Sequence, residues 1–109
     1  MATVEELVAR SRAAQKQFEF APQEQADAAA KAICKVVYDH QEELGRLAAE
    51  ETRMGKVEDK IAKCRNKSKT VWLGMKGKKS RGIIDWDEDT QIAKVAKPIG
   101  VIGSVTPTT

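Results

Sequence analysis

Two cysteines, one histidine and a group of carboxylates are the side chains that could support nucleophilic or acid–base catalysis. A general acid–base pair of carboxylates needs a shaped pocket that separates their two pKa values, whereas Glu50, Glu51, Glu58 and Asp59 fall at the ends and on the faces of expected helices. A cysteine becomes a nucleophile when a neighbouring base or cation favours its thiolate, so its surroundings decide its role. Cys34 and Cys64 form no Cys-x-x-Cys motif, and both fall on or beside the apolar side of an expected helix, where free cysteine usually behaves as a small hydrophobic residue. His40 falls at a junction between two expected helices. We therefore predict no catalytic residue and no metal site in this sequence.

The last stretch of the sequence, residues 97–109, combines a Lys-Pro opening, a β-branched run and a Thr/Pro end. The apolar residues of the run suit a short strand that is buried on both faces: Ile99, Val101, Ile102 and Val105. Its two glycines are too few and wrongly spaced for a dinucleotide-binding fingerprint. The loop after such a strand lies where open α/β sheets bind their ligands. Four residues are therefore the ligand-loop candidates: Thr106, Pro107, Thr108 and Thr109.

Helices are expected to precede this stretch. Thr3 and Glu6 fit a capping box, which predicts a first helix whose apolar stripe runs to Phe18. Pro22 suits the first position of a second helix, because its fixed φ matches the helix and its missing N–H would have no partner there. A third helix is expected from about Gln41, since apolar residues recur at helical spacing from there.

The following residues predict a fourth helix and a β-hairpin. Gly55 is placed to end the third helix in a left-handed cap, and the fourth helix is expected from about Val57. Residues 82–86 and 91–96 flank an acidic turn at residues 87–90, which is typical of a hairpin. A two-stranded hairpin is marginal alone, so the hairpin and the later strand both favour a larger sheet. The sequence thus predicts an α/β fold: N-terminal helices, a hairpin and a first strand, forming the truncated opening part of a larger enzyme.

Length and composition are consistent with a single small unit. A chain of 109 residues suits one compact domain, but an aromatic content of 5% predicts a thin core. The first residues are acidic and lack the basic and apolar regions of a signal peptide. No apolar run approaches the roughly 18 residues that a membrane span needs. We expect a cytoplasmic protein with no membrane partner.

Several stretches together carry a family resemblance. They are Lys97-Pro98-Ile99-Gly100-Val101-Ile102-Gly103-Ser104-Val105-Thr106-Pro107-Thr108-Thr109, Glu51-Thr52-Arg53-Met54-Gly55-Lys56-Val57-Glu58-Asp59-Lys60, Asn66-Lys67-Ser68-Lys69 with Val71-Trp72, and Gln15 with Phe18. In these stretches the sequence resembles the N-terminal segment of CoA-acylating aldehyde dehydrogenases, which include acetaldehyde and succinate-semialdehyde dehydrogenases and the front half of bifunctional aldehyde-alcohol dehydrogenases. Arg53 departs from the pattern, because the family prefers glycine there.

The resemblance implies an oxidoreductase that converts an aldehyde, NAD or NADP, and coenzyme A to an acyl-CoA. In the family a cysteine thiolate, which lies beyond this sequence, attacks the aldehyde; hydride passes to NAD(P), and the thioester is transferred to coenzyme A. Residues 1–79 would be the N-terminal helical part, 80–97 the hairpin of a bridging and oligomerisation element, and 98–109 the start of the cofactor-binding domain. Residues 106–109 would line the nicotinamide-ribose side of the cofactor. The parent would be a homo-oligomer, and the 109 residues alone would be inactive.

Residues 60–81, here called the basic segment, hold nine basic side chains and no acidic one. Because the net charge of the chain is +3, the remaining residues carry −6. Three interpretations stay open: a solvated helix face, a face towards coenzyme A or another subunit, and a surface that attracts nucleic acid. Nucleic acid is the least favoured of the three. It nevertheless supports an alternative function, a stand-alone helical interaction module that binds nucleic acid or a partner protein.

Overall fold

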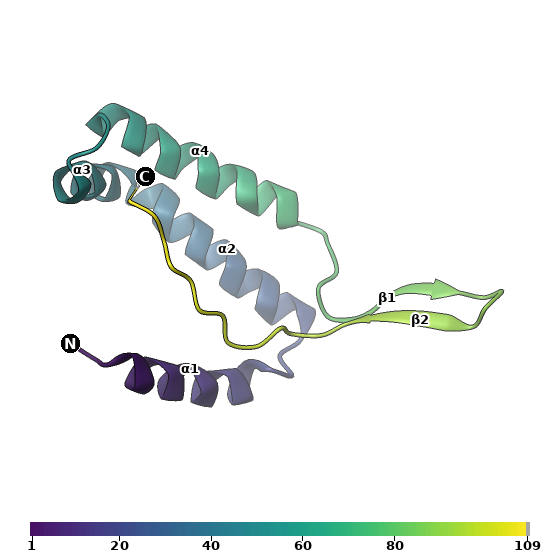
Figure 1. The fold of residues 1–109 in the computed structure, drawn as a ribbon. Coiled ribbons are helices and arrows are strands. Elements are labelled where there is room, and N and C mark those ends of the chain that lie inside the picture. Colours follow the sequence, from purple (N-terminus) through teal and green to yellow (C-terminus); the bar gives the residue numbers. More distant parts are fainter. Residues whose placement is uncertain (109) are drawn as a thin grey trace. The chain divides into compact units, whose positions relative to one another are not determined.

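The computed structural model describes residues 1–108, which contain four helices and one antiparallel pair of strands (Figure 1). This content agrees with the expected α/β class and with the expected order of helices and hairpin. The chain divides into two compact units. The hairpin unit comprises residues 1–26 and 78–105, and the helical unit comprises residues 27–77 and the end of the described chain.

In the hairpin unit, helix α1 (Val4–Phe18) begins at the expected capping box. The Glu6 N–H donates to Thr3 Oγ1 at 3.2 Å, and the Thr3 N–H donates to the Glu6 carboxylate at 3.0 Å. These two bonds satisfy backbone donors that the first turn of any helix leaves without an internal partner. The capping-box prediction is confirmed.

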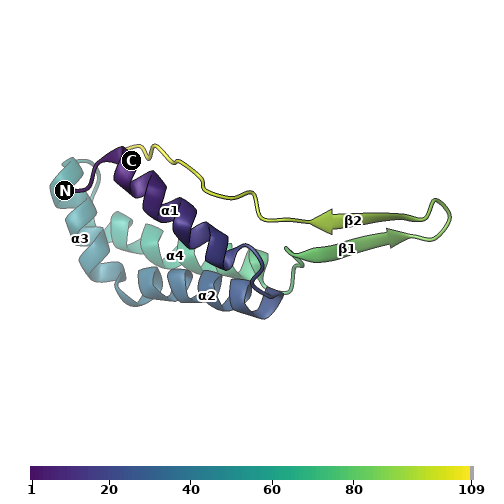
Figure 2. The same cartoon turned by 90° about the horizontal axis from the view of Figure 1, so that it is seen from below.

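Strands β1 (Gly82–Asp87) and β2 (Ile92–Ala96) form the expected hairpin, which Figure 2 shows from the side. Their antiparallel register shifts once, between Ile83 and Asp85. Lys94 Nζ and the Asp85 carboxylate form a cross-strand ion pair at 3.2 Å. Both side chains of that pair are well exposed, so the pair contributes little, and backbone pairing and the turn hold the hairpin.

A cluster of hydrogen bonds ties the base of the hairpin to the end of α1 and the start of α2 (Gln23–Asp39). Gln23 Oε1 accepts from the backbone N–H groups of Ser80 at 2.8 Å and Arg81 at 3.1 Å, and Gln23 Nε2 donates to Ser80 Oγ at 2.9 Å. The Arg81 guanidinium donates to the carbonyls of Phe18 at 3.2 Å and Glu19 at 2.9 Å, and it lies 4.9 Å from the centre of the Phe18 ring. We call this set of contacts the hairpin clasp.

The acidic turn of the hairpin is closed by the side chain of Asp87. Its Oδ1 accepts from the N–H groups of Asp89 at 3.0 Å and Thr90 at 3.4 Å. Hydrogen bonds from the side chain and backbone of Thr90, and from the backbone of Asp89, lower the pKa of Asp87 below its usual 3.8. Gln91 completes the reversal in the left-handed region, with φ of 55°.

The lowered pKa of Asp87 predicts an acid-sensitive turn. The folded pKa lies below the unfolded value, so the stabilisation is present above the unfolded pKa and is lost as the pH falls through the folded pKa. We expect the Asp89 and Thr90 amide signals in NMR spectra to move towards unstructured positions below about pH 4. Asp87→Asn should abolish this titration, whereas the matched change Glu88→Gln should retain it. An unchanged acid transition in Asp87→Asn would contradict the assignment.

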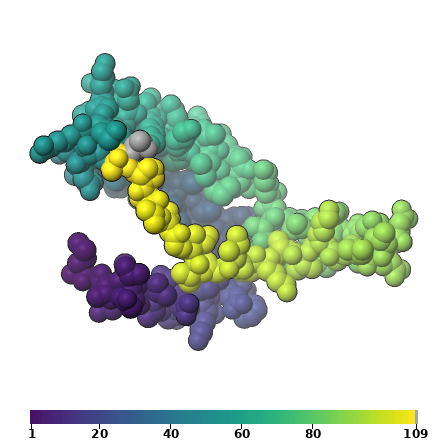
Figure 3. All heavy atoms as spheres, viewed as in Figure 1, coloured from purple at the N-terminus to yellow at the C-terminus, as the bar shows by residue number. Residues whose placement is uncertain are grey.

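The strand predicted over residues 99–105 is not formed. Residues 97–108 contain no regular element, and Figure 3 shows residues 97–105 as an extended surface segment after the hairpin. Ile99 is 89% exposed and Val105 is 101% exposed, so the expectation of burial on both faces is also wrong. A strand needs backbone partners, and the β1–β2 pair is the whole sheet of residues 1–108. The first strand of an aldehyde-dehydrogenase-like fold is therefore absent from the described chain.

In the helical unit, helices α3 (Gln41–Thr52) and α4 (Val57–Met75) pack closely against each other. Gly45 is the buried residue of α3, and a Cβ atom placed on it would lie 2.6 Å from Ile61 Cγ1 and 2.7 Å from Ile61 N. Only glycine allows this approach, because any Cβ would overlap the backbone of α4. The expected start of α4 at Val57 is confirmed.

The rest of the helical unit has no fully buried apolar side chain among its described residues. From Asp27 onward, α2 runs alongside α4 in the opposite direction, with a wider backbone separation than between α3 and α4 (Figures 1 and 2). Ser68 of α4 is buried, at 8% exposure, and its Oγ donates to the Cys64 carbonyl at 2.6 Å. Pro22 is the residue immediately before α2, whose first residue is Gln23, so Pro22 does not occupy the expected first position of the helix.

The left-handed cap of α3 falls on Arg53 and not on Gly55, which corrects the sequence expectation. Arg53 has φ of 53° and ψ of 27°, and its N–H donates to the Ala49 carbonyl at 2.9 Å. Gly55 also has a positive φ of 76°, but it lies in the connection that leads to α4. A side chain in the left-handed region costs about 1 kcal/mol, because its Cβ crowds the following carbonyl.

Arg53→Gly should therefore stabilise the protein. The change relieves the left-handed strain, partly offset by the greater chain entropy of unfolded glycine, so we expect a gain of about 0.5–1 kcal/mol in the free energy of unfolding. Urea unfolding followed by circular dichroism measures this difference. Arg53→Ala is the matched control, because it removes the same side-chain charge while keeping the Cβ. Equal effects of the two variants would refute the strain at Arg53.

Candidate functional site

Two of the four ligand-loop candidates lie at an open pocket of the helical unit. Pro107 and Thr108 share this pocket, of about 460 Å³, with side chains from α2, α3 and α4. The Thr108 hydroxyl donates to Met54 Sδ at 3.7 Å, a weak bond because sulfur is a poor acceptor. Thr106 does not line the pocket, and Thr109 lies outside the described residues. We call it the loop pocket.

Both cysteines also line the loop pocket. Cys34 comes from α2 and Cys64 from α4; both thiols are free and partly buried. The apolar residues that line the pocket with them are Ile33, Val37, Ala48 and Val71. The apolar part of this lining suits small hydrophobic residues such as free cysteines.

His40 is not part of this pocket. It is the residue before the first turn of α3, and its Nδ1 lies 3.3 Å from the Val36 carbonyl oxygen. The structure thus places it at the helix junction, as expected. Within residues 1–108 no group of three or more His, Cys, Asp or Glu side chains is arranged to hold a metal ion.

The charged residues of the loop pocket are mostly basic. Lys60, Lys63 and Lys67 line it from α4, and Glu51 lines it from α3. Seven of the nine basic residues of the basic segment are well exposed; Lys60 and Arg81 are partly buried. Arg81 is bound to backbone carbonyls in the hairpin clasp, so it belongs to a structural contact. None of the helices in the described part of the chain is long and apolar enough to cross a bilayer.

Comparison with known proteins relates nearly the whole chain to one kind of enzyme. The chain is 45% identical over 107 residues to the acetylating succinate-semialdehyde dehydrogenase of Clostridium kluyveri, a match that covers 98% of this chain and 24% of the relative. The chain is similar to the N-terminal segment of CoA-acylating aldehyde dehydrogenases. The resemblance noted in the sequence is thereby confirmed.

Other relatives of the same kind agree with this match to acylating aldehyde dehydrogenases. The acylating sulfoacetaldehyde dehydrogenase of Bilophila wadsworthia is 40% identical over 111 residues, covering 100% of this chain and 24% of the relative. The bifunctional aldehyde-alcohol dehydrogenase of Escherichia coli K12 is 32% identical over 109 residues, covering 100% of this chain and 12% of the relative. The chain thus spans about a quarter or less of the curated relatives it matches. No family model matches the chain.

Three structural features of the described chain escaped sequence reasoning. The shared pocket of Cys34 and Cys64 joins residues from two helices, and no local pattern relates them. The closeness of Gly45 to Ile61 has a weak sequence signal, a glycine inside an otherwise regular helix. The clasp between Gln23 and residues 80–81 has no sequence signal, because its partners are 57 and 58 residues apart.

Proposed function

We propose that these residues form the N-terminal part of an enzyme that converts an aldehyde, NAD(P)+ and coenzyme A to an acyl-CoA, NAD(P)H and a proton. The observation that carries this proposal is the similarity of nearly the whole chain to acylating aldehyde dehydrogenases. The 109 residues alone should be inactive. A cytoplasmic location is part of the same proposal.

Within this enzyme, Thr106, Pro107, Thr108 and Thr109 are proposed to lie on the nicotinamide-ribose side of the cofactor. The open pocket next to Pro107 and Thr108 supports a ligand-facing role for this loop. Residues 98–109 would then begin the cofactor-binding domain, after a helical part (residues 1–79) and the hairpin element (residues 80–97). The catalytic thiolate would come from outside these residues.

The hairpin is proposed to join subunits of a homo-oligomer. Its apolar side chains are open to solvent, with Ile83 60% exposed and Ile92 61% exposed. A hairpin with two free edges and uncovered apolar side chains is stable only marginally alone, so it gains from a neighbouring chain.

A chimaera tests the proposed activity. The matching N-terminal segment of the Clostridium kluyveri enzyme is replaced by this chain, and NAD(P)H formation from succinate semialdehyde is measured with coenzyme A present. We expect the chimaera to be active and the separate 109-residue chain to be inactive. A folded chimaera without activity would contradict the proposal, and turnover by the separate chain would contradict its assignment as an incomplete part. The native relative is the positive control.

The alternative, a nucleic-acid-binding module, is supported by the exposure of most of the basic segment. Binding through clustered lysines and arginines would weaken steeply as salt is raised, because counterions are released from the phosphates. Retention of the chain on a nucleic-acid column at low salt distinguishes the two proposals. No retention would exclude nucleic-acid binding by the basic segment.

A further inference from the structure

A second pocket of the helical unit lies between α2 and α4 and is lined by seven residues. Four of them come from one face of α2, at helical spacing, and three from the facing side of α4: Lys31, Cys34, Lys35, Tyr38, Ser68, Lys69 and Trp72. Its volume is about 270 Å³, just below the range of about 300–1,000 Å³ that is usual for ligand pockets. A pocket of this size suits only a small molecule. We call it the tryptophan pocket.

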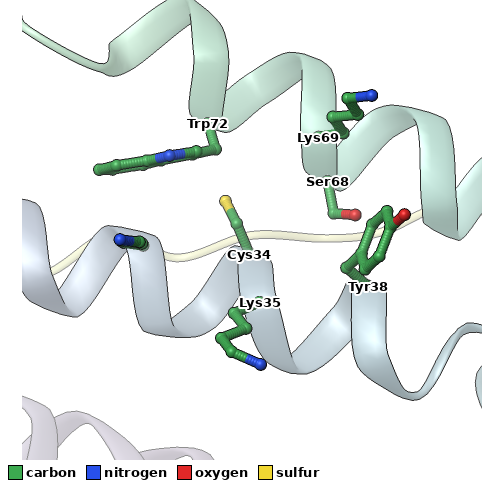
Figure 4. A pocket seen from close by; sticks show the side chains of 7 residues that line it. Cys34, Lys35, Tyr38, Ser68, Lys69 and Trp72 are labelled. Carbon is green, nitrogen blue, oxygen red and sulfur yellow. The ribbon is translucent and has the colours of Figure 1, made fainter.

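The walls of the tryptophan pocket suit a flat apolar body. Figure 4 shows Cys34 and Tyr38 pointing from α2 towards α4, and Ser68 and Trp72 pointing from α4 towards α2. The indole of Trp72 and the phenol ring of Tyr38 stand at opposite ends of the opening, with the Cys34 thiol between them (Figure 4). Ser68 offers no free donor to a ligand, since its hydroxyl already donates to the Cys64 and Arg65 carbonyls. Aromatic walls of this kind favour offset or edge-to-face contact with another ring.

The rim of the tryptophan pocket is purely cationic. Three of its seven lining residues are lysines, and none is acidic. Lys35 pairs with Asp39 on the same helix, and its side chain extends away from α4 in Figure 4. Lys31 and Lys69 lie on opposite helices. The Lys69 side chain extends away from α2 in Figure 4, so contact with a bound negative charge requires these long flexible side chains to turn towards the opening. The charge of this rim is complementary to an anion.

We propose that the tryptophan pocket binds a small aromatic carboxylate, with its ring between Trp72 and Tyr38 and its carboxylate near Lys31 and Lys69. The tryptophan pocket shares Cys34 and Ser68 with the loop pocket, but neither Pro107 nor Thr108 lines it. The binding proposal does not depend on the dehydrogenase proposal, because no step of the acyl transfer enters the argument.

The test uses 2-naphthoate as the probe and 2-naphthalenemethanol as its uncharged counterpart. The sequence has two tryptophans, so Trp86→Phe leaves Trp72 as the sole indole, and its Nε1–H signal reports binding by NMR. We expect a saturable shift with 2-naphthoate and a dissociation constant of about 1 mM or tighter. The alcohol should bind about three- to tenfold more weakly, since it lacks the charge that the lysines recognise.

Two double lysine variants in the Trp86→Phe background distinguish an effect of the lysines at the pocket from an effect of the overall positive charge of the protein. Lys31→Gln combined with Lys69→Gln should bring 2-naphthoate down to the affinity of the alcohol. The matched control, Lys78→Gln with Lys79→Gln, removes two basic residues that lie outside the pocket and should change nothing. Circular dichroism checks that both variants fold. Absence of saturable binding up to about 10 mM, equal affinities of acid and alcohol, or equal effects of the two double variants would each overturn the proposal.

Discussion

Gly45→Ala is expected to lower the free energy of unfolding by about 2 kcal/mol. Alanine favours a helix over glycine by about 1 kcal/mol, but its Cβ would meet Ile61 atoms at 2.6–2.9 Å, and two of these are backbone atoms. Because a backbone cannot rotate away like a side chain, α3 and α4 must separate, and overpacking of this kind costs about 1–3 kcal/mol or more. The loss is large for a protein without a fully buried apolar side chain among residues 1–108. Thermal unfolding followed at 222 nm measures it.

Gly74→Ala is the matched control for this experiment. Gly74 lies in α4, and no heavy atom stands within 4 Å of the position that its Cβ would take. The same substitution should therefore raise stability, by up to about 1 kcal/mol. In an Ile61→Ala background, Gly45→Ala should still lower the free energy of unfolding, although by less than in the natural sequence. The overlap with Ile61 Cγ1 is gone there, but the overlaps with Ile61 N and Cα remain. No loss in that background would show that side-chain crowding, and not backbone approach, sets the requirement for glycine.

Gln23→Ala is expected to release the base of the hairpin. It removes the acceptor of the Ser80 and Arg81 N–H groups and the donor to Ser80 Oγ. Each such bond contributes about 0.5–1.5 kcal/mol, so we expect the local free energy of opening to fall by about 1–3 kcal/mol. Amide hydrogen exchange measures this opening directly, and protection of the Ser80 and Arg81 amides should drop by one to two orders of magnitude.

The control for the clasp is Gln25→Ala, which removes an exposed glutamine of the same helix. It should leave exchange at Ser80 and Arg81 unchanged. A further variant, Arg81→Lys, keeps the positive charge but loses the fork that reaches the carbonyls of both Phe18 and Glu19. It should weaken the same base of the hairpin. If the Ser80 and Arg81 amides exchange at the same rates in Gln23→Ala and in Gln25→Ala, the clasp does not hold the hairpin.

Local features of the chain were predictable because their causes lie within a few residues. The Thr3–Glu6 capping box predicted the start of α1, and helical spacing of apolar residues predicted the four helices. An acidic segment between two apolar runs predicted the hairpin. The family resemblance was also readable, since it rests on contiguous stretches that the relatives share.

Features that depend on distant partners were missed or wrong. The run at residues 99–105 has the composition of a buried strand, yet composition supplies no neighbouring strand to bind its backbone. The left-handed residue after α3 is Arg53, although the nearby Gly55 suits that conformation better in isolation. Neither pocket could be located, because each collects side chains from separate helices.

The sequence by itself determined the helices, the hairpin and the kinship with acylating aldehyde dehydrogenases, because capping, periodicity and shared motifs are properties of neighbouring residues. Only the tertiary structure decided that Gly45 admits the backbone of α4, that Gln23 binds the hairpin base, and that Trp72 and Tyr38 line one pocket with three lysines. Each of these depends on the distance between segments far apart in the chain, which packing sets and residue order does not.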